Sequence, residues 1–388
     1  MNAGVAPIPV LLVSTATEYI GTAKIPAALA NAGFEVSLLT PRNTLAAKSR
    51  FVSRCRFLGD ATTPSEWLSA FTEIVRETSP RLALPCDDNA FRLLRSLVSA
   101  PPQALPPDLR HQLSTLARES LGNPAHYETS INKVLLTPAA DALGVRVPPY
   151  AIVTTLSEAA GFAAQRGFPV VLKLGYGVAG EWVRVAADPR ELAATFDELL
   201  AAPATSFGQG GSRQLLVQSH IDGNSVLQSI VAWNGSVLAG YAREKLIADP
   251  LPKGPSTVSR TFHCPEAREF AERLTAAFGM HAFFGVEFIA DRRTGRLYLL
   301  EINRRITPGT PVGTLIDIDL CAALHDALHS RPSSVRKDLD PGEEHLIAHF
   351  PQEFLRDPES RFLVEHRTDC PWDDPGLMEA MLTLRHAR

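Results

Sequence analysis

The sequence predicts a mixed fold, in which a small parallel α/β domain is followed by a larger α+β region. The first hundred residues alternate short apolar runs (10–13, 34–39 and 81–85) with helical patterns, which is typical of βαβ units in a parallel sheet. A proline-rich stretch at 101–107 favours a linker. From residue 170 onward strand-like segments dominate, and two pairs of them have the spacing of β-hairpins.

We expect the chain to divide into residues 1–105, residues 106–331 and a C-terminal extension at 332–388. At 388 residues it is too long for one compact core. Within the second region, the dipeptide Asn234-Gly235 predicts a tight hairpin turn. The extension mixes charge clusters with apolar runs, and it fits either a small packed extension or an arm of a homodimer.

The composition describes an ordinary globular protein. A formal net charge of -4, with 45% hydrophobic and 21% charged residues, argues against nucleic acid as a partner. No apolar run reaches the roughly 18 to 20 residues needed to cross a bilayer, and the N-terminus lacks the charged region of a signal peptide. We therefore expect a cytoplasmic protein without a membrane partner. The five cysteines are scattered and form no C-x-x-C pair, which argues against a zinc or redox centre.

The end of the third predicted strand holds two acidic residues, Asp87 and Asp88. Open α/β sheets present ligand contacts at this edge, but capping of the following helix explains the two residues better. No G-x-G-x-x-G follows the first strand, so dinucleotide binding is not expected. No Ser/His/Asp or H-E-x-x-H arrangement is visible, which disfavours triad hydrolases and zinc proteases.

The second predicted hairpin pairs 284–290 with 296–303. Period-two geometry places its even-numbered apolar residues on one buried face, namely Phe284, Val286, Phe288, Ala290, Tyr298, Leu300 and Ile302. Glu287, Glu301 and Asn303 then share the opposite face. The register that keeps both apolar rows on one side sets Glu287 directly opposite Glu301.

Two facing carboxylates in the middle of a sheet predict a metal site. Like charges opposed on neighbouring strands are destabilising, and a divalent cation held by hard oxygen ligands would compensate them. Asn303 adds a neutral oxygen. Magnesium usually keeps few protein carboxylates and completes its octahedron with water and phosphate, so these three ligands suit a nucleotide site. The alternative is a solvated polar face, which the apolar neighbours disfavour.

The motif formed by 286–288 and 299–305 resembles the metal-binding signature of the ATP-grasp superfamily, whose members include D-alanine–D-alanine ligase and biotin carboxylase. Further motifs follow the order of that superfamily: Asn132-Lys133, then 171–173 with three glycines, then 217–223. More loosely, 120–124 and 254–257 resemble predicted carboxylate-amine ligases of the superfamily.

The resemblance implies a domain organisation. Residues 1–105 would form the α/β domain that precedes the grasp module, and 106–331 would form the ATP-grasp domain. Two β-rich subdomains of that domain would enclose ATP, with a lid at about 150–222. The glycine-containing loop at 206–212 is either part of this lid or an ordinary surface loop.

The resemblance also assigns phosphate contacts. Lys133 and Lys173 would supply positive charge to the nucleotide phosphates, and an unpaired ammonium in the apolar strand around Lys173 is costly unless an anion meets it. The loop with Gly175, Gly177 and Gly180 could bring backbone N–H groups to phosphate oxygens. The alternatives are surface lysines and ordinary turns.

For the rest of the nucleotide, the segment Gln218, Ser219, His220 and Ile221 would read adenine with a side-chain acceptor and two backbone groups. Gln218 replaces the usual glutamate, and its amide oxygen can still accept from the exocyclic amine. Ser225 stands where relatives often carry an acid for the ribose hydroxyls. Lys245 occupies a strand position of a further phosphate-binding base, although an exposed hairpin lysine explains it equally well.

The implied reaction uses ATP with Mg²⁺ or Mn²⁺ to activate a small-molecule carboxylate as an acyl phosphate, which an amine captures. Arg305 follows Asn303 by two residues and could hold a carboxylate or the acyl phosphate, so it is the main catalytic candidate together with Lys173. Arg304 is expected to point away, as a surface residue or a salt-bridge partner. The alternatives are a catalytically inactive ATP-binding module and an ATP-grasp enzyme with a thiol or carbamate-type acceptor.

Overall fold

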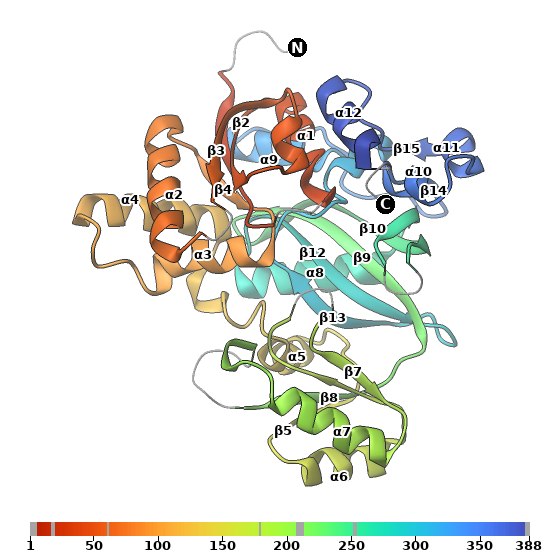
Figure 1. Ribbon diagram of the computed structural model, residues 1–388. Coiled ribbons are helices and arrows are strands. Elements are labelled where there is room, and N and C mark those ends of the chain that lie inside the picture. The colour runs from red at the N-terminus through yellow and green to blue at the C-terminus, as the bar shows by residue number, and fades with distance from the viewer. Residues whose placement is uncertain are drawn as a thin grey trace.

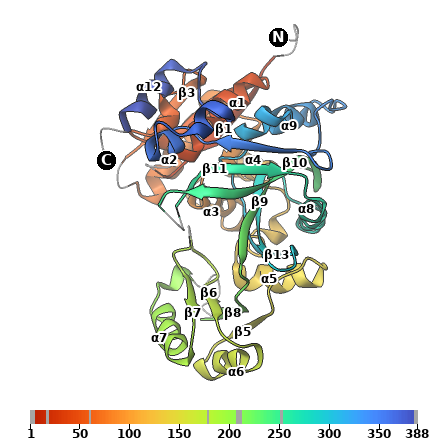
Figure 2. The ribbon, with the colours of Figure 1, turned by 90° about the vertical axis from the view of Figure 1, so that its right-hand side faces the viewer.

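The computed structural model describes residues 6–16, 20–59, 62–177, 180–206, 213–250 and 254–384. Its strands form three sheets: a parallel N-terminal sheet, a small antiparallel sheet and a large seven-stranded sheet. The small sheet and two helices form a separate lobe at the bottom of Figure 1 and Figure 2. Of the loop predicted at 206–212, only Ser206 lies within the described residues.

The N-terminal sheet is parallel throughout, with the strand order β3-β2-β1-β4, which confirms the predicted parallel sheet. Its strands are β1 (Ile8–Val13), β2 (Phe34–Pro41), β3 (Val52–Leu58) and β4 (Leu82–Pro85). Its helices are α1 (Ile25–Asn31), α2 (Pro64–Thr78), α3 (Asp88–Ser99) and α4 (Pro107–Leu121). The strand β3 was not predicted, because this edge strand is rich in polar residues and only its last residue is buried.

The small sheet is antiparallel and has the order β5-β8-β6-β7. Its strands are β5 (Tyr150–Val153), β6 (Val170–Lys173), β7 (Val183–Ala186) and β8 (Leu215–Ser219). Two helices, α6 (Leu156–Arg166) and α7 (Pro189–Leu200), pack on it and on each other around a core of their own. The lobe therefore has a hydrophobic core separate from that of the large sheet.

The large sheet has the order β13-β12-β9-β10-β11-β14-β15, and all its pairs are antiparallel except β14 with β15. Its first strands are β9 (Gly223–Trp233), β10 (Ser236–Ala248), β11 (Ser256–Phe262), β12 (Ala282–Asp291) and β13 (Leu297–Asn303). The flanking helices are α5 (Lys133–Ala142), α8 (Pro265–Phe278) and α9 (Leu320–Leu328). Asn234 and Gly235 both have positive φ, which confirms the tight turn predicted between β9 and β10.

The C-terminal segment packs against the rest of the molecule. Its strand β14 (Glu344–Ala348) extends the large sheet by pairing with β11, and β15 (Arg367–Thr368) follows β14. Three short helices accompany them, namely α10 (Gln352–Arg356), α11 (Arg361–Glu365) and α12 (Pro375–Thr383). Of the two predicted alternatives, the segment therefore meets the description of a packed extension.

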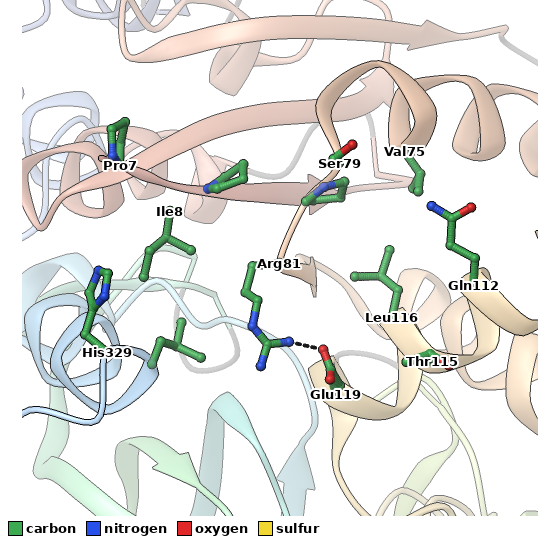
Figure 3. A pocket seen from close by; sticks show the side chains of 13 residues that line it. Pro7, Ile8, Val75, Ser79, Arg81, Gln112, Thr115, Leu116, Glu119 and His329 are labelled. Atoms are coloured by element: carbon green, nitrogen blue, oxygen red, sulfur yellow. Dashed lines mark hydrogen bonds and ion pairs between the residues drawn. The ribbon is translucent and has the colours of Figure 1, made fainter. Parts of the chain in front are cut away.

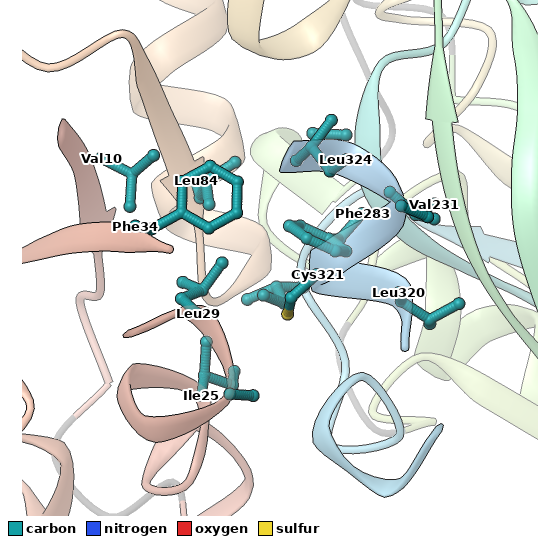
Figure 4. Close-up of a cluster of buried hydrophobic side chains, with 14 of the residues drawn as sticks. Val10, Ile25, Leu29, Phe34, Leu84, Val231, Phe283, Leu320, Cys321 and Leu324 are labelled. Atoms are coloured by element: carbon teal, nitrogen blue, oxygen red, sulfur yellow. The ribbon is translucent and has the colours of Figure 1, made fainter. Parts of the chain in front are cut away.

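A shared core joins the N-terminal sheet to the large sheet. In Figure 4, Val10, Phe34 and Leu84 of the N-terminal sheet lie on the left, and Leu324 of α9 lies on the right with Val231 and Phe283 of the large sheet. A second core lies between α8 and the other face of the large sheet. Because much of both faces of the large sheet is buried in these two cores, only the remaining side chains of the sheet can line the cavity described below. None of the helices among the described residues is long and apolar enough to cross a membrane.

Candidate functional site

The predicted metal hairpin is formed by β12 and β13. Glu287 pairs directly with Glu301, and Gly285 pairs with Asn303, which confirms that the two carboxylates oppose each other. Glu287, Glu301 and Asn303 all line one cavity of about 880 Å³. The strand parity inferred from the sequence thus holds at the end of the hairpin that bears the three polar residues.

Toward the tip of the hairpin, the predicted apolar row is wrong. The register slips by one residue after Glu287. Leu297 and Leu299 are therefore buried, at 3% and 2% exposure, whereas Tyr298 and Leu300, predicted to lie inside, are partly exposed. A bulge changes which residues face the core beyond it, and alternation of residue types alone does not reveal where it falls.

The two carboxylates have different surroundings. Burial and the charge of Glu301 raise the pKa of Glu287, and the Ser225 hydroxyl donates to Glu287 Oε1 at 2.8 Å. Burial would also raise the pKa of Glu301, but Lys133, whose Nζ lies 2.9 Å from Glu301 Oε2, and Lys173 outweigh it, so this pKa is lowered. Among the described residues Glu301 has an ion-pair partner and Glu287 has none, so a bound cation would stabilise mainly the ionised form of Glu287.

Lys133 and Lys173 approach the carboxylates from other elements. Lys133 begins α5, and the 6% exposed Lys173 ends β6 in the small sheet. Burial and the nearby Lys133 lower the pKa of Lys173 to about 8, and the ammonium makes no hydrogen bond or ion pair within the described part of the chain. An unpaired buried ammonium next to the carboxylates suits an anion bound between the two sheets.

The glycines after β6 meet Lys133 through carbonyl groups. Lys133 donates its backbone N–H to Gly175 O at 2.9 Å and its Nζ to Gly177 O at 3.4 Å. Gly177 lines the cavity, and a Cβ there would come within 3.0 Å of the Trp182 ring. Gly180 has a positive φ of 76°, which favours glycine. The predicted contacts of this loop with phosphate remain a prediction, because residues 178–179 lie outside the described residues.

Arg305 reaches the cavity next to Asn303. Its backbone N–H donates to Asn303 O at 2.8 Å, its guanidinium donates to Asn303 Oδ1 at 3.4 Å, and Asp88 Oδ2 lies 3.4 Å from its Nε. The strand ends at Asn303, so a turn rather than a continuing strand brings Arg305 to this side. The guanidinium is thereby held between the metal hairpin and the N-terminal domain.

The expectation for Arg304 is wrong. This residue is 4% exposed, and burial lowers its pKa to about 10. Its guanidinium donates to Ser130 Oγ at 2.8 Å and to Leu121 O at 2.5 Å, and it lies over the Phe91 ring. Arg304 turns away from the cavity, as predicted, but toward the interior, where neutral oxygen acceptors satisfy it.

Asp87 confirms the helix-capping interpretation. It precedes α3 and accepts from the backbone N–H of Ala90 at 2.8 Å. The same carboxylate accepts from the backbone N–H of Thr15 at 2.6 Å, which ties the loop after β1 to the cavity. Asp88 contacts Arg305 instead.

The segment predicted to read adenine forms the end of β8 and the residues after it. Ser219 and His220 donate their backbone N–H groups to Pro149 O and Pro169 O, so these donors are engaged within the protein. The buried Gln218 Oε1 has no hydrogen-bond partner among the described residues, which leaves it free to accept from a ligand. None of the four residues from Gln218 to Ile221 lines the cavity, so adenine recognition here remains a prediction.

Ser225 and Lys245 both line the cavity, on neighbouring strands. Because the Ser225 hydroxyl is bound to Glu287, it orients a carboxylate of the predicted metal site. Lys245 Nζ donates to Gly254 O at 2.9 Å, and its charge lowers the pKa of Glu287. Neither contact tests the predicted roles at the ribose and the phosphates.

The donor set fits magnesium. Within the described part of the chain, no three His, Cys, Asp or Glu side chains gather as a metal site. The protein therefore offers two carboxylates and one amide oxygen, and water and phosphate would supply the remaining ligands, which is how Mg²⁺ is usually held beside nucleotides. Glu287, Glu301 and Asn303 are the residues that would hold it.

Four residues that the sequence did not predict line the opposite end of the cavity. They are Lys24, Ser259, His349 and Asp369, and they form a connected chain of contacts. No local pattern marks them, because they lie far apart in the sequence. Arg243 of β10 also lines the cavity.

A second hollow, of about 560 Å³, lies between the start of β1, α2, α4 and the end of α9. Figure 3 shows Arg81 paired with Glu119 in it, surrounded by Ile8, Val75 and Leu116. Since its charged pair is already matched, this hollow offers no comparable site for a metal or a nucleotide.

The sheets, the carboxylate pair and the converging lysines are those of an ATP-grasp domain. Residues 132–321 match the family described as "Carbamoyl-phosphate synthase L chain, ATP binding domain", and the chain carries an ATP-grasp domain of this family. The match includes every residue predicted to contact metal or nucleotide. It excludes Lys24, His349 and Asp369.

Individual relatives agree with this assignment. Human mitochondrial pyruvate carboxylase is 27% identical over 224 residues, which cover 55% of this chain and 18% of that protein. The chain thus spans a small part of this relative. The biotin carboxylase domain of Hydrogenobacter thermophilus 2-oxoglutarate carboxylase, in complex with MgADP, ADP and bicarbonate, has a TM-score of 0.65 at 17% identity, covering 87% of this chain and 73% of that one. N5-carboxyaminoimidazole synthetase of Staphylococcus aureus has a TM-score of 0.61 at 11% identity, covering 87% and 81%.

Proposed function

We propose that the protein is an ATP-dependent carboxylate-amine ligase. It activates a small-molecule carboxylate as an acyl phosphate and joins it to an amine, with release of ADP and phosphate. The single observation that supports this most strongly is the direct opposition of Glu287 and Glu301 in a cavity that also holds Lys133, Asn303 and Arg305. Such a cluster positions and neutralises the charge of transferring phosphate groups.

In the first step, an oxygen of the substrate carboxylate attacks the γ-phosphorus of ATP, and the bond from that phosphorus to ADP breaks. Lys133 and Lys173 hold the phosphates, and Arg305 holds the carboxylate and then the acyl phosphate. Magnesium bound by Glu287, Glu301 and Asn303 would supply charge neutralisation. The small-sheet lobe excludes water, so that the acyl phosphate meets the amine before it hydrolyses.

A second candidate differs in the carboxylate. A related domain was solved with bicarbonate and MgADP, so bicarbonate could serve as the activated carboxylate and yield a carbamate-type product. This candidate needs the same metal and phosphate contacts, and the choice of carboxylate separates the two.

The first experiment is a screen for ADP release over small carboxylates, bicarbonate and amines with Mg²⁺, with product masses measured. We expect release with one carboxylate and amine pair, and its elimination in Glu301→Gln. Glu272→Gln, an exposed glutamate of α8 paired with Arg268, is the matched control and should keep full activity. Full activity in Glu301→Gln would contradict the metal assignment. ATP binding without turnover across the panel would instead support an inactive ATP-binding module.

We further infer a cytoplasmic location, and a homodimer in solution is consistent with the dimer named for the related carboxylase domain. Light scattering on the purified chain would measure its mass directly. A mass of one chain at all concentrations would exclude the dimer.

A further inference from the structure

One face of the large sheet forms a polar surface of the cavity that runs across four strand pairs. Glu301 faces Glu287, Glu287 faces Leu227, and Leu227 faces Arg243. On the neighbouring row, Ser225 lies on β9 and Lys245 on β10, and Lys245 faces Ser259 of β11. All seven residues line the cavity. At roughly 4.8 Å per strand, Ser259 lies about 14 Å from the strand of Glu287, too far to act on the same phosphate.

At the far end of this face, the C-terminal segment supplies a hydrogen-bonded chain. His349 follows β14 and donates its backbone N–H to Thr257 O, which keeps its ring on the side of Ser259. Ser259 Oγ lies 2.8 Å from His349 Nε2, and His349 Nδ1 lies 3.3 Å from Asp369 Oδ2. Ser259 is 1% exposed and His349 5% exposed, yet both line the cavity.

The carboxylate of Asp369 is held firmly. Lys24 Nζ lies 2.5 Å from Asp369 Oδ2, and the backbone N–H of Phe350 donates to Asp369 Oδ1 at 2.7 Å. Burial would raise the pKa of Asp369, but Lys24 and His349 outweigh it and hold this pKa well below its usual range. Asp369 therefore stays ionised and fixes the orientation of the imidazole.

The imidazole itself is kept neutral. Burial lowers the pKa of His349, Asp369 opposes the shift, and the cations Arg243 and Lys24 add to it. A neutral ring with Nδ1–H bound to a carboxylate presents Nε2 as a proton acceptor toward Ser259 Oγ. The arrangement is a base with a hydroxyl between it and the cavity.

Arg243 lies between the two ends of the face. It lines the cavity and makes no hydrogen bond or ion pair within the described part of the chain. A guanidinium that is partly buried and unmatched, beside the proton acceptor, suits a carboxylate on the bound ligand.

We propose that Arg243, Ser259, His349 and Asp369 form the subsite for the acceptor amine, and that this acceptor is an amino acid. Arg243 holds the carboxylate of the amino acid, and its ammonium group donates to Ser259 Oγ. This proposal rests on the proposed ligase function, since it describes the second substrate of that reaction.

Two protons leave the ammonium group as the C–N bond forms. The ammonium gives one proton to Ser259 Oγ while the Ser259 hydroxyl proton passes to His349 Nε2, and Asp369 stabilises the resulting imidazolium. The freed lone pair forms the C–N bond at the acyl carbon. The carbon–oxygen bond to phosphate breaks, phosphate leaves with that electron pair, and it takes up a second proton from the nitrogen. His349 then releases the first proton to solvent.

Hydroxylamine as an alternative acceptor measures formation of the acyl phosphate independently of the proposed acceptor subsite. It is already uncharged near pH 7, so it captures an acyl phosphate without a base. In the full-length chain, we expect His349→Gln and Ser259→Ala to form hydroxamate at the wild-type rate but to condense the amino acid about 10²-fold more slowly. The deficit of His349→Gln should shrink as the pH rises and solvent deprotonates the amine.

His345→Gln is the matched control, since His345 lies on β14 shortly before His349, contacts Glu343 and does not line the cavity. Both reactions should stay at the wild-type rate in this variant. Thermal unfolding and MgATP binding of each variant show whether it is folded. Two results would overturn the proposed proton transfer through Ser259 and His349. One is an equal condensation rate in wild type, His349→Gln and Ser259→Ala, and the other is a covalent acyl group on Ser259 found by mass spectrometry.

The acceptor class has its own test. We compare an amino acid that wild type uses with the amine that lacks its carboxylate. Arg243→Met should raise the KM for the amino acid by about 10-fold to 10²-fold and leave that for the matched amine unchanged, because a hydrogen bond to a charged group is lost only in the first case. If wild type forms hydroxamate but condenses none of the common amino acids, the proposal that the acceptor is an amino acid is wrong. Absence of hydroxamate from wild type with every carboxylate tested would defeat the ligase function itself.

Discussion

The two ends of the cavity are built from different stretches of the chain. At the metal end, Glu287 and Glu301 lie on one hairpin, and Lys133 meets them from the same family domain, residues 132–321. At the other end, Ser259 meets His349 and Asp369 from the C-terminal segment. The family domain thus contains all the residues proposed to contact metal and phosphate, whereas the acceptor end combines Arg243 and Ser259 of that domain with His349 and Asp369 from outside it.

The largest expected effect is at the metal end. Glu287→Gln should slow both hydroxamate formation and amine condensation by about 10³-fold, because charge neutralisation at the phosphates serves both reactions. The same change removes the repulsion from Glu301, so in EDTA the variant should melt about 2 °C higher than wild type. ADP release and thermal unfolding measure the two effects. If Glu287→Gln lost amine condensation but kept hydroxamate formation, the two ends of the cavity would not have the separate roles proposed for them.

Two adjacent arginines sharpen the role of the metal end. Arg305→Met should lower kcat for both reactions by about 10²-fold without a change in stability, since Arg305 lines the cavity. Arg304→Met should instead lower the free energy of unfolding by about 1 to 3 kcal/mol, because Leu121 O and Ser130 Oγ lose their donor. Urea unfolding and steady-state kinetics separate the two. Reversed outcomes would mean that the two side chains have been misassigned.

A smaller effect is expected at Ser225. Its hydroxyl orients Glu287, so Ser225→Ala should weaken the apparent affinity for Mg²⁺ by about 10-fold, with a similar rate at saturating metal. Titration of ADP release with Mg²⁺ tests this. An altered KM for ATP with unchanged Mg²⁺ dependence would favour the ribose role instead.

The smallest effect concerns the pH dependence of stability at the acceptor end. Since the pKa of His349 is lowered in the folded state, the unfolded chain binds its proton first as the pH falls. Stability due to this residue is thus present above the ordinary histidine pKa of about 6.5 and is lost as the pH falls toward the folded value. His349→Gln should lose less stability than wild type over that window, by on the order of 1 kcal/mol. Urea unfolding at several pH values gives the comparison, and parallel curves would contradict it.

The sequence predicts the metal end because its geometry is local. Alternation along two strands joined by a short turn determines that Glu287 faces Glu301. Alternation does not locate the bulge that follows Glu287, because leucine and tyrosine side chains such as Leu299 and Tyr298 can lie on either face of a strand. The buried Arg304 escaped prediction for a related reason: its acceptors, Leu121 O and Ser130 Oγ, come from a distant segment.

The acceptor end could not be predicted because it has no local pattern. Ser259 and His349 become neighbours only when β14 pairs with β11, and Asp369 is fixed by Lys24 near the start of the chain. The pairing of strands far apart in sequence is a property of the tertiary fold. For the same reason, no triad-like spacing is visible around any of these residues.

The contact between Lys24 and Asp369 also bears on the order in which the cavity is completed during synthesis. Domains fold broadly from the N-terminus as the chain leaves the ribosome. All the groups of the metal end have been made by Arg305, whereas the partner of Lys24 appears only with Asp369. A growing chain can thus first assemble the half of the cavity that is proposed to bind phosphate, and Lys24 stays without its carboxylate until the last strand docks.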